Sequence, residues 1–286
     1  LLNSIIMDLD QVIKKYTDEY SKFITVDGLK VHYKDEGKGE VLLLLHGTFS
    51  SLHTFDDWAV LLKENYRVIR LDLPGFGITG PSLDDKYSIP IFVDFIYKFL
   101  DALGVNRFYL AGNSLGGWLA WELALKAEDR IKKMVLLNSA GYINDRNYPL
   151  PFVVAQTPVL RNVFNYIPKA VVRRFIRQVF NDQAVVTDQL VDRYFSLIHR
   201  EGNLDAFVKI ANSKLKQNTH SLNELKIPVL IIWGSKDRWL SPKHAAYFNK
   251  DIPNSRVLMY DNVGHIPMEE IPEKSAKDVA DFLVEN

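Results

Sequence analysis

Short apolar runs recur along the chain and are separated by stretches of helical periodicity. The runs typical of strands buried on both faces lie at residues 41–45, 66–71, 108–111, 134–137, 229–233 and 257–260. Upstream of them, residues 23–26 and 29–33 flank Asp27-Gly28, a dipeptide that predicts a β-hairpin. An antiparallel start followed by strand–helix alternation predicts an α/β domain, with a mostly parallel sheet and helices on both faces.

Several predicted helices are marked at their first turn. Ser88 can cap a helix that has Pro90 in its first turn and an apolar stripe from Ile91 to Leu103. Ser241-Pro242 is a similar start for a later helix, and Pro272 starts the last one. We expect these helices to cover the faces of the sheet.

The strand–helix alternation is interrupted between about Gly141 and Leu222. This stretch has no run typical of a buried strand, and it contains helical patterns and several prolines. Residues 171–180 form an apolar helix face with arginines on the opposite side. We expect residues 141–222 to form a helical cap inserted into a core of residues 1–140 and 223–286. Such a cap must pack on the sheet edge and still leave a cavity.

Composition narrows the classes of function. The 286 residues carry 35 Lys and Arg against 35 Asp and Glu, so no basic surface for nucleic acid is expected. Hydrophobic residues make up 47%, which is enough for a sizeable core. The chain has no cysteine and no H-E-x-x-H motif, and Gly75 and Gly77 lack the third glycine of a cofactor loop. We therefore expect neither metal nor cofactor, and the oligomeric state stays open.

The N-terminal segment bears on membrane contact and location. Leu1, Ile5, Leu9, Val12 and Tyr16 recur at helical spacing and predict a helix lying on the domain. No run of about 18 apolar residues occurs, so no membrane-spanning helix is expected. Because the chain starts without methionine, an upstream export signal could have been removed. The compartment stays open, with the cytoplasm as the default expectation.

The motif Gly112-Asn113-Ser114-Leu115-Gly116-Gly117 joins a strand-like run to a helical pattern. This is G-x-S-x-G at a strand-to-helix junction, where the sharp turn exposes the serine hydroxyl. The turn crowds its own backbone, and glycines on both sides relieve that crowding. We predict that Ser114 is a nucleophile at the carboxyl edge of the sheet.

A serine nucleophile needs a base, and the base needs an acid that orients it. His265 follows the last strand-like run and precedes the last helix, so its loop returns to the edge where Ser114 lies. Asp237 follows the run at 229–233. The chain order serine, acid, histidine is the one expected of α/β-hydrolases, and it favours these three over the other histidines. Asp72 ends a strand before the nucleophile, so we interpret it as a residue that organises a turn.

Acyl transfer also needs N–H donors for the oxyanion. One is the N–H of Leu115, directly after the nucleophile. The second should come from the loop after residues 41–45, where Thr48 is our preferred donor and Phe49 the alternative. We expect His46 to brace this loop without taking part in proton transfer.

At His46-Gly47, residues 70–77, residues 112–117, Asp237 and Gly264-His265, the chain resembles the α/β-hydrolase superfamily over nearly its whole length. The resemblance implies the α/β-hydrolase fold, with a mostly parallel eight-stranded sheet and an inserted helical cap over the pocket. It also implies a Ser114, Asp237 and His265 triad.

Within the superfamily, residues 70–77 and 112–117 resemble the capped bacterial esterases and lipases of lipolytic family V. They also resemble the meta-cleavage carbon–carbon bond hydrolases and haloperoxidase-like enzymes. Serine at position 114 argues against haloalkane dehalogenases and epoxide hydrolases, which carry aspartate there. The carbon–carbon hydrolases usually have a tryptophan after the catalytic histidine, where this chain has Ile266, and a more glycine-rich oxyanion loop. Both departures favour ester hydrolysis.

We therefore expect a serine carboxylesterase or lipase that hydrolyses small-molecule esters of short to medium acyl chains through an acyl-enzyme on Ser114. Four aromatic residues are available to line the acyl site, although each also fits core packing: Phe152, Phe164, Phe175 and Phe180. Three alternatives stay open. They are carbon–carbon bond hydrolysis of meta-cleavage ring-fission products, ligand binding with vestigial activity, and acyl transfer to an acceptor other than water.

Overall fold

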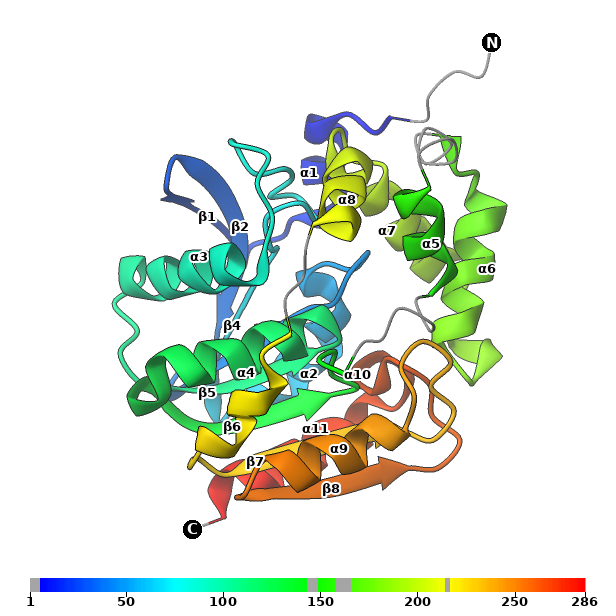
Figure 1. Ribbon diagram of the computed structural model, residues 1–286. Helices are drawn as coiled ribbons and strands as arrows, with labels where there is room; N and C mark the ends of the chain where they lie inside the picture. The colour runs from blue at the N-terminus through cyan, green and yellow to red at the C-terminus, as the bar shows by residue number, and fades with distance from the viewer. Residues whose placement is uncertain (1–5, 143–148, 158–165, 214–216, 286) are drawn as a thin grey trace.

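The computed structural model describes residues 6–142, 149–157, 166–213 and 217–285. In this part of the chain, eight strands form one sheet in the order β1-β2-β4-β3-β5-β6-β7-β8 (Figure 1). Pairing is antiparallel between β1, β2 and β4, and parallel across the rest of the sheet. This confirms the mostly parallel eight-stranded sheet. The strands are β1 (Ser21–Val26), β2 (Leu29–Glu36), β3 (Glu40–Leu45), β4 (Tyr66–Leu71), β5 (Phe108–Asn113), β6 (Ile131–Leu137), β7 (Val229–Gly234) and β8 (Ser255–Tyr260).

The hairpin between β1 and β2 forms at Asp27-Gly28 as predicted. Both residues have positive φ, 47° for Asp27 and 83° for Gly28. A two-residue turn of this kind matches the right-handed twist of the flanking strands. The hairpin is therefore set by local turn chemistry.

Helices cover both faces of the sheet, as the alternation predicted. Two of them lie in one hydrophobic cluster, α2 with Trp58 and α11 with Val279, and the helices α3, α4 and α9 contribute to the other. The helices outside the segment between β6 and β7 are α1 (Leu9–Tyr16), α2 (Asp56–Leu62), α3 (Ile89–Ala102), α4 (Leu115–Ala127), α9 (Lys243–Asp251), α10 (Pro267–Glu270) and α11 (Pro272–Val284). Short 3-10 helices are η1 (Leu52–Phe55), η2 (Glu128–Arg130), η4 (Gln183–Val185) and η5 (Thr219–Glu224).

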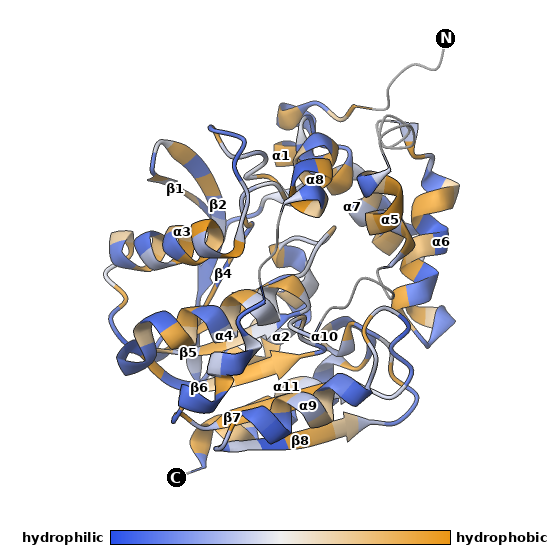
Figure 2. Cartoon of the chain, viewed as in Figure 1, coloured by the Kyte–Doolittle hydropathy of each residue, from blue (hydrophilic) through white to orange (hydrophobic). Residues whose placement is uncertain are grey.

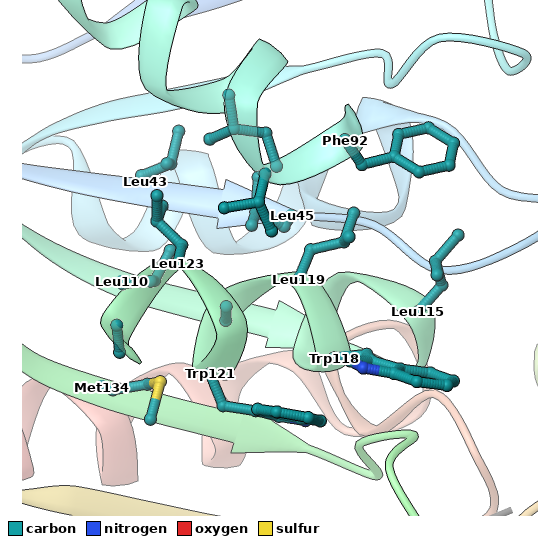
Figure 3. Packing of buried hydrophobic residues seen from close by; sticks show 14 of the residues in the cluster. Leu43, Leu45, Phe92, Leu110, Leu115, Trp118, Leu119, Trp121, Leu123 and Met134 are labelled. Atoms are coloured by element: carbon teal, nitrogen blue, oxygen red, sulfur yellow. The ribbon is translucent and has the colours of Figure 1, made fainter. Parts of the chain in front are cut away.

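Strand β3 shows why the central runs are continuously apolar. Leu43 and Leu45 belong to the cluster beneath α3 and α4, whereas Leu42 and Leu44 belong to the cluster beneath α2 and α11. Successive side chains point to opposite faces, so both faces of a covered strand must be apolar. Figure 3 shows the first cluster from close by, and in Figure 2 the central strands are the most hydrophobic part of the sheet.

Two details of the apolar pattern were predicted wrongly. Val257 and Met259 in β8 are 37% and 40% exposed, because β8 is the last strand of the sheet and has a neighbour on one side only. Ile91 is 42% exposed, although the stripe that follows it on α3 is buried. Ser88 does cap α3, since its side chain accepts a hydrogen bond from the Ile91 N–H.

The segment between β6 and β7 holds α5 (Leu150–Gln156), α6 (Lys169–Val179), α7 (Asp188–Ile198) and α8 (Asn203–Asn212). These helices lie together beyond the carboxyl ends of the parallel strands (Figure 1). The residues described in this segment contain no named strand. Phe164 lies outside the described residues, as do Leu1 and Ile5 of the predicted N-terminal helix.

Helix α1 packs on the body of the protein from Leu9 onward. Val12 is fully buried against Ile78 and Leu197. No helix in the described ranges is both long and apolar enough to cross a bilayer.

Candidate active site

Ser114 lies in a strained turn between β5 and α4. Its backbone has φ 55° and ψ −115°, a conformation that non-glycine residues rarely adopt. Such strain costs about 1–3 kcal/mol and persists at functional sites where the surrounding structure enforces it. The turn is held by hydrogen bonds from the Ser114 N–H to the Leu137 carbonyl at 3.1 Å and from the Ala140 N–H to the Ser114 carbonyl at 3.0 Å.

The glycines around Ser114 are required by close contacts. A Cβ atom on Gly112 would lie 2.2 Å from the Gly116 carbonyl oxygen, and one on Gly116 would lie 2.1 Å from the Leu45 carbonyl oxygen. On Gly117 it would lie 2.5 Å from Ser139 Oγ. The motif therefore has three glycines because the helix start is pressed against the neighbouring strand ends.

His265 and Asp237 are hydrogen-bonded partners. His265 Nδ1 lies 2.7 Å from Asp237 Oδ2, and the two residues are only 3% and 7% exposed. Because a carboxylate oxygen accepts, Nδ1 carries the proton and Nε2 is left as the acceptor nitrogen. Ser114 and His265 line the same cavity. The structure thus brings together the three residues that the sequence singled out.

Asp237 is held by a full set of donors. Its Oδ1 accepts from the backbone N–H groups of Trp239 at 2.8 Å and Leu240 at 2.9 Å. Its Oδ2 accepts from Asn138 Nδ2 at 2.7 Å, beside the bond from His265. The carboxylate is therefore fixed in position, and it fixes the imidazole in turn.

Two asparagines that sequence reasoning missed brace the site. The Asn113 side chain donates to the Leu137 carbonyl at 3.1 Å and to the His265 carbonyl at 3.0 Å. Asn138 bonds Asp237 and also approaches the Gly264 carbonyl at 3.3 Å. Both follow a buried apolar run, at the strand end, and that position was the available signal.

The histidine loop is tied to α6 by the carboxylate of Glu270. This side chain accepts from the N–H groups of Gly264 at 2.8 Å, Asn181 at 3.1 Å and Asp182 at 2.7 Å. The His265 N–H also donates to the Val179 carbonyl at 2.7 Å. A residue of α10 therefore sets the loop that carries His265 against the end of a helix lining the cavity.

Of the candidate oxyanion donors, Thr48 and Phe49 line the same cavity, and Leu115 directly follows Ser114. Gly47 lies so close to Ser114 that a Cβ on Gly47 would be 2.9 Å from Ser114 Cβ, and Phe49 has φ 63°. In the described part of the chain, the N–H groups of Thr48, Phe49 and Leu115 have no hydrogen-bond acceptor. Leu115 also begins α4, where the positive end of the helix dipole favours negative charge.

Asp72 has a structural environment away from that cavity. It is fully buried and accepts from the N–H groups of Leu52 and Ile78, each at 2.8 Å, while His32 Nδ1 lies 2.8 Å from its Oδ2. Burial by itself raises the pKa of Asp72, but the bond and the charge of His32 outweigh it and lower this pKa to about 2. The carboxylate therefore ties β2 and the start of η1 to the loop after β4, in agreement with a turn-organising role.

His46 braces the loop that follows β3. Its Nδ1 donates to the Gly47 carbonyl at 2.8 Å, and its Nε2 accepts from the Leu73 N–H at 3.0 Å. Burial lowers the pKa of His46, so the ring stays neutral and both nitrogens are used in bracing.

The cavity beside Ser114 is small and apolar. Its open volume is about 50 Å³, which is room for a few water molecules. Among the lining residues that the structure describes, His265 is the only side chain able to carry a positive charge. The apolar part of its wall comes mainly from α6, α7 and the loops near β7 and β8, and comprises Phe49, Ile167, Val172, Phe175, Ile176, Val179, Ile198, Trp239 and Ile266.

The candidate aromatic residues are placed differently from one another. Phe175 lines the cavity, as expected. Phe180 is buried in the core cluster, and Phe152 packs edge-to-face on Phe207 with ring centroids 5.2 Å apart. One of the three described residues therefore contributes to the wall. Within the described ranges, no group of three or more metal-ligating side chains could hold a metal ion.

Comparison with known proteins agrees with the fold described above. A family model described as the alpha/beta hydrolase fold matches residues 40–272. The uncharacterized hydrolase YugF of Bacillus subtilis (strain 168) is 29% identical, over 91% of this chain and 96% of the relative. A 2-hydroxy-6-oxononadienedioate/2-hydroxy-6-oxononatrienedioate hydrolase of Burkholderia vietnamiensis is also 29% identical, over 92% of this chain and 95% of the relative.

Among solved structures, a membrane phospholipase A is similar, with a TM-score of 0.77 and 26% identity over 92% of this chain and 85% of that one. Together the similarities confirm the predicted fold and the hydrolase class. By name, these similar proteins include a phospholipase and a hydrolase of oxononadienedioates, so the substrate class must be argued from the cavity.

Proposed function

Because the chain belongs to the alpha/beta hydrolase family, we propose that it is a serine carboxylesterase in which Ser114, His265 and Asp237 form the catalytic triad. The observation that carries this proposal is the arrangement around Ser114. A strained serine and a histidine line one apolar cavity, and that histidine is hydrogen-bonded to a buried aspartate. The proposed substrates are neutral esters with short to medium apolar acyl groups.

The proposed chemistry follows from which nitrogen of His265 carries a proton and which one can accept a proton. His265 Nε2 takes the proton of Ser114 while the serine oxygen attacks the ester carbonyl. The same nitrogen then gives this proton to the departing alcohol, which leaves an acyl-enzyme on Ser114. Water, deprotonated by His265, attacks the acyl carbon, and the proton returns to Ser114 as the acid leaves. Asp237 stabilises the imidazolium formed in each half of the cycle.

The proposed oxyanion donors are the N–H of Leu115 and that of Thr48, with Phe49 as the alternative second donor. These groups have no acceptor in the described structure, so no bond must be broken when the charge develops. Preorganised donors of this kind contribute about 10²–10³-fold each to kcat. The positive end of α4 adds to the same effect.

We further propose that residues 141–222 form a cap on the core of residues 1–140 and 223–286. Support comes from α6 and α7, which supply Val172, Phe175, Ile176 and Tyr194 to the cavity opposite the strand ends. An acyl chain would lie between these helices and Ser114. With about 50 Å³ of open volume, the cavity as it stands favours short acyl groups.

Carbon–carbon bond hydrolysis is the second candidate, and the names of several relatives favour it. Their named substrates are acids, and a dienedioate carries two carboxylates at neutral pH. Burying a carboxylate without a partner is very costly, and the described lining of this cavity offers no cation besides His265. This apolar lining favours the neutral ester.

The test compares two substrate classes on the same preparation. We expect wild-type protein to hydrolyse p-nitrophenyl butyrate and to leave a 2-hydroxy-6-oxo-dienoate ring-fission product essentially unchanged. Ser114→Ala should lower butyrate turnover by about 10⁴-fold or more while keeping the circular dichroism spectrum. Turnover of the dienoate with little esterase activity would establish the second candidate. Tight ester binding without turnover, or product transfer to added alcohol or peroxide, would point to the binding and acyl-transfer alternatives.

A further inference from the structure

A second, smaller cavity lies behind the wall of the Ser114 cavity. It has about 10 Å³ of open volume and shares Phe49, Ser50 and Ile198 with the first cavity as lining residues. Its remaining lining comes from the glycine-containing loop after β4 and from α7, α8 and the turn between them. A single layer of side chains therefore separates the two cavities.

The central part of this layer is an aromatic pair. The ring of Phe49 lies 4.0 Å from that of Phe207 on α8, centroid to centroid, and Phe207 lines only the second cavity. Phe207 is 1% exposed and backs the Phe49 ring from the cap side. If the Phe207 side chain is displaced or shortened, the Phe49 ring can move toward α8, and the two cavities can then join.

Asn203, one of the residues that line the second cavity, has an unsatisfied polar atom. Asn203 is 4% exposed, and its Nδ2 donates to the Gly77 carbonyl at 3.0 Å and to the Leu197 carbonyl at 2.8 Å. These two acceptors fix the orientation of the amide. Asn203 Oδ1 is buried and has no hydrogen-bond partner. A buried acceptor without a donor is costly, and a group that donates to it is favoured accordingly.

The chemistry of this cavity selects its occupant. Apart from Asn203, the side chains beyond the shared layer are apolar, among them Phe76, Leu204 and Phe207. A charged group is therefore excluded, whereas a chain of methylenes with one neutral O–H fits both the walls and the free acceptor. The open volume is close to the minimum for one water molecule, so the site has to open before it admits a chain.

We propose that the second cavity is the distal part of the acyl site, and that it takes an acyl chain whose hydroxyl group donates to Asn203 Oδ1. This inference rests on the proposed ester hydrolysis. An acyl group on Ser114 that outgrows the first cavity reaches the layer of Phe49 and Ile198. Passing this layer brings the chain to Asn203. The enzyme would then prefer hydroxylated medium-chain esters to plain ones of equal length.

The first experiment changes only the substrate. Wild-type protein is assayed with p-nitrophenyl butyrate, octanoate and ω-hydroxyoctanoate. We expect kcat/KM for the hydroxyoctanoate to exceed that for octanoate by about five- to tenfold, the value of satisfying one buried acceptor. In Asn203→Ala this ratio should fall to about one, while butyrate, which does not reach Asn203, keeps its kcat/KM.

The second experiment opens the layer. Phe207→Ala should raise kcat/KM for octanoate relative to butyrate by about tenfold, and Phe207→Leu should do so by less. Phe152→Ala is the matched control, because Phe152 also packs on the Phe207 ring but lines neither cavity. An equal change in Phe152→Ala would show general loosening of the helices and overturn the proposal.

A binding measurement separates this inference from the proposed function. In Ser114→Ala, calorimetry should show ω-hydroxyoctanamide binding about five- to tenfold more tightly than octanamide. This binding comparison tests the second site even if the protein turns over no ester. A lack of ester turnover would refute the proposed function but not the second site. Equal binding and equal kcat/KM for the hydroxylated and plain chains would overturn the second site, whatever the activity on butyrate.

Discussion

Glu270 offers the sharpest test of how the site is held together. Its carboxylate accepts three backbone N–H groups, those of Gly264, Asn181 and Asp182, and the residue is 8% exposed. Glu270→Gln keeps the shape of the side chain but replaces one acceptor oxygen with an amide that donates. Whichever way the amide turns, at least one backbone N–H then faces an N–H₂ group.

The expected cost can be worked from these contacts. A hydrogen bond to a charged group contributes about 1.5–3 kcal/mol, and the orphaned N–H adds a desolvation penalty. We therefore expect the free energy of unfolding to fall by about 3 kcal/mol. Because Gly264 directly precedes His265, the imidazole is also misplaced, and kcat for p-nitrophenyl butyrate should fall by about 10- to 100-fold.

Urea unfolding followed by circular dichroism measures the first effect, and steady-state kinetics the second. Glu273→Gln is the matched control, since Glu273 is exposed at the start of α11 and its substitution should change stability by less than about 0.5 kcal/mol. If Glu270→Gln behaves like Glu273→Gln in both measurements, the carboxylate does not position the histidine loop and the reasoning is refuted.

Three further substitutions probe other parts of the fold. Gly116→Ala should abolish soluble expression or lower the thermal midpoint strongly, because its Cβ would lie 2.1 Å from the Leu45 carbonyl oxygen; a wild-type midpoint would contradict this contact. Leu43→Ala should lower the free energy of unfolding by about 2–5 kcal/mol in urea titrations, since Leu43 is fully buried under α3 and α4. Asp72 has a folded pKa of about 2, below its unfolded value of about 3.9, so its stabilisation is present above about pH 4 and is lost as the pH falls toward 2. Asp72→Asn should be less stable at pH 7 by on the order of 2 kcal/mol and should lose less stability over that acid range, as measured by urea titrations at each pH.

The features that could be predicted from sequence are those encoded locally. The hairpin at Asp27-Gly28 follows from two residues that accept positive φ, and the position of Ser114 follows from glycines that a strand-to-helix turn requires. The central strands follow from runs without a polar position. In each case the residues that specify the local structure lie in the same short stretch of chain as the structure itself.

The features that could not be predicted depend on distant partners. Asn138 and Asp237 are 99 positions apart, and nothing near Asn138 shows that it will meet a carboxylate. The exposure of Val257 and Met259 depends on β8 being the edge strand, which is a property of the strand order. Phe152, Phe175 and Phe180 are all phenylalanines in the segment between β6 and β7, so only the packing shows that Phe175 reaches the cavity.

The turn at residues 265–270 links the proposed chemistry to the proposed cap. It carries His265 and also two adjacent carboxylates that reach different helices. Glu270 accepts from the backbone at the end of α6, while Glu269 forms an ion pair with Arg193 and accepts from Tyr194 Oη at 2.7 Å. Burial, together with the Glu269 carboxylate, raises the pKa of Tyr194 and keeps its hydroxyl protonated as a donor.

Tyr194 and the α6 side chains line the cavity, so its walls and the proposed base, His265, are held by one short piece of backbone. A substrate that shifts either helix must therefore strain the bonds of Glu269 or Glu270, and through them the position of His265. Discrimination between acyl groups should then appear in kcat as well as in KM, because a poorly fitting chain displaces the base and not only the binding surface.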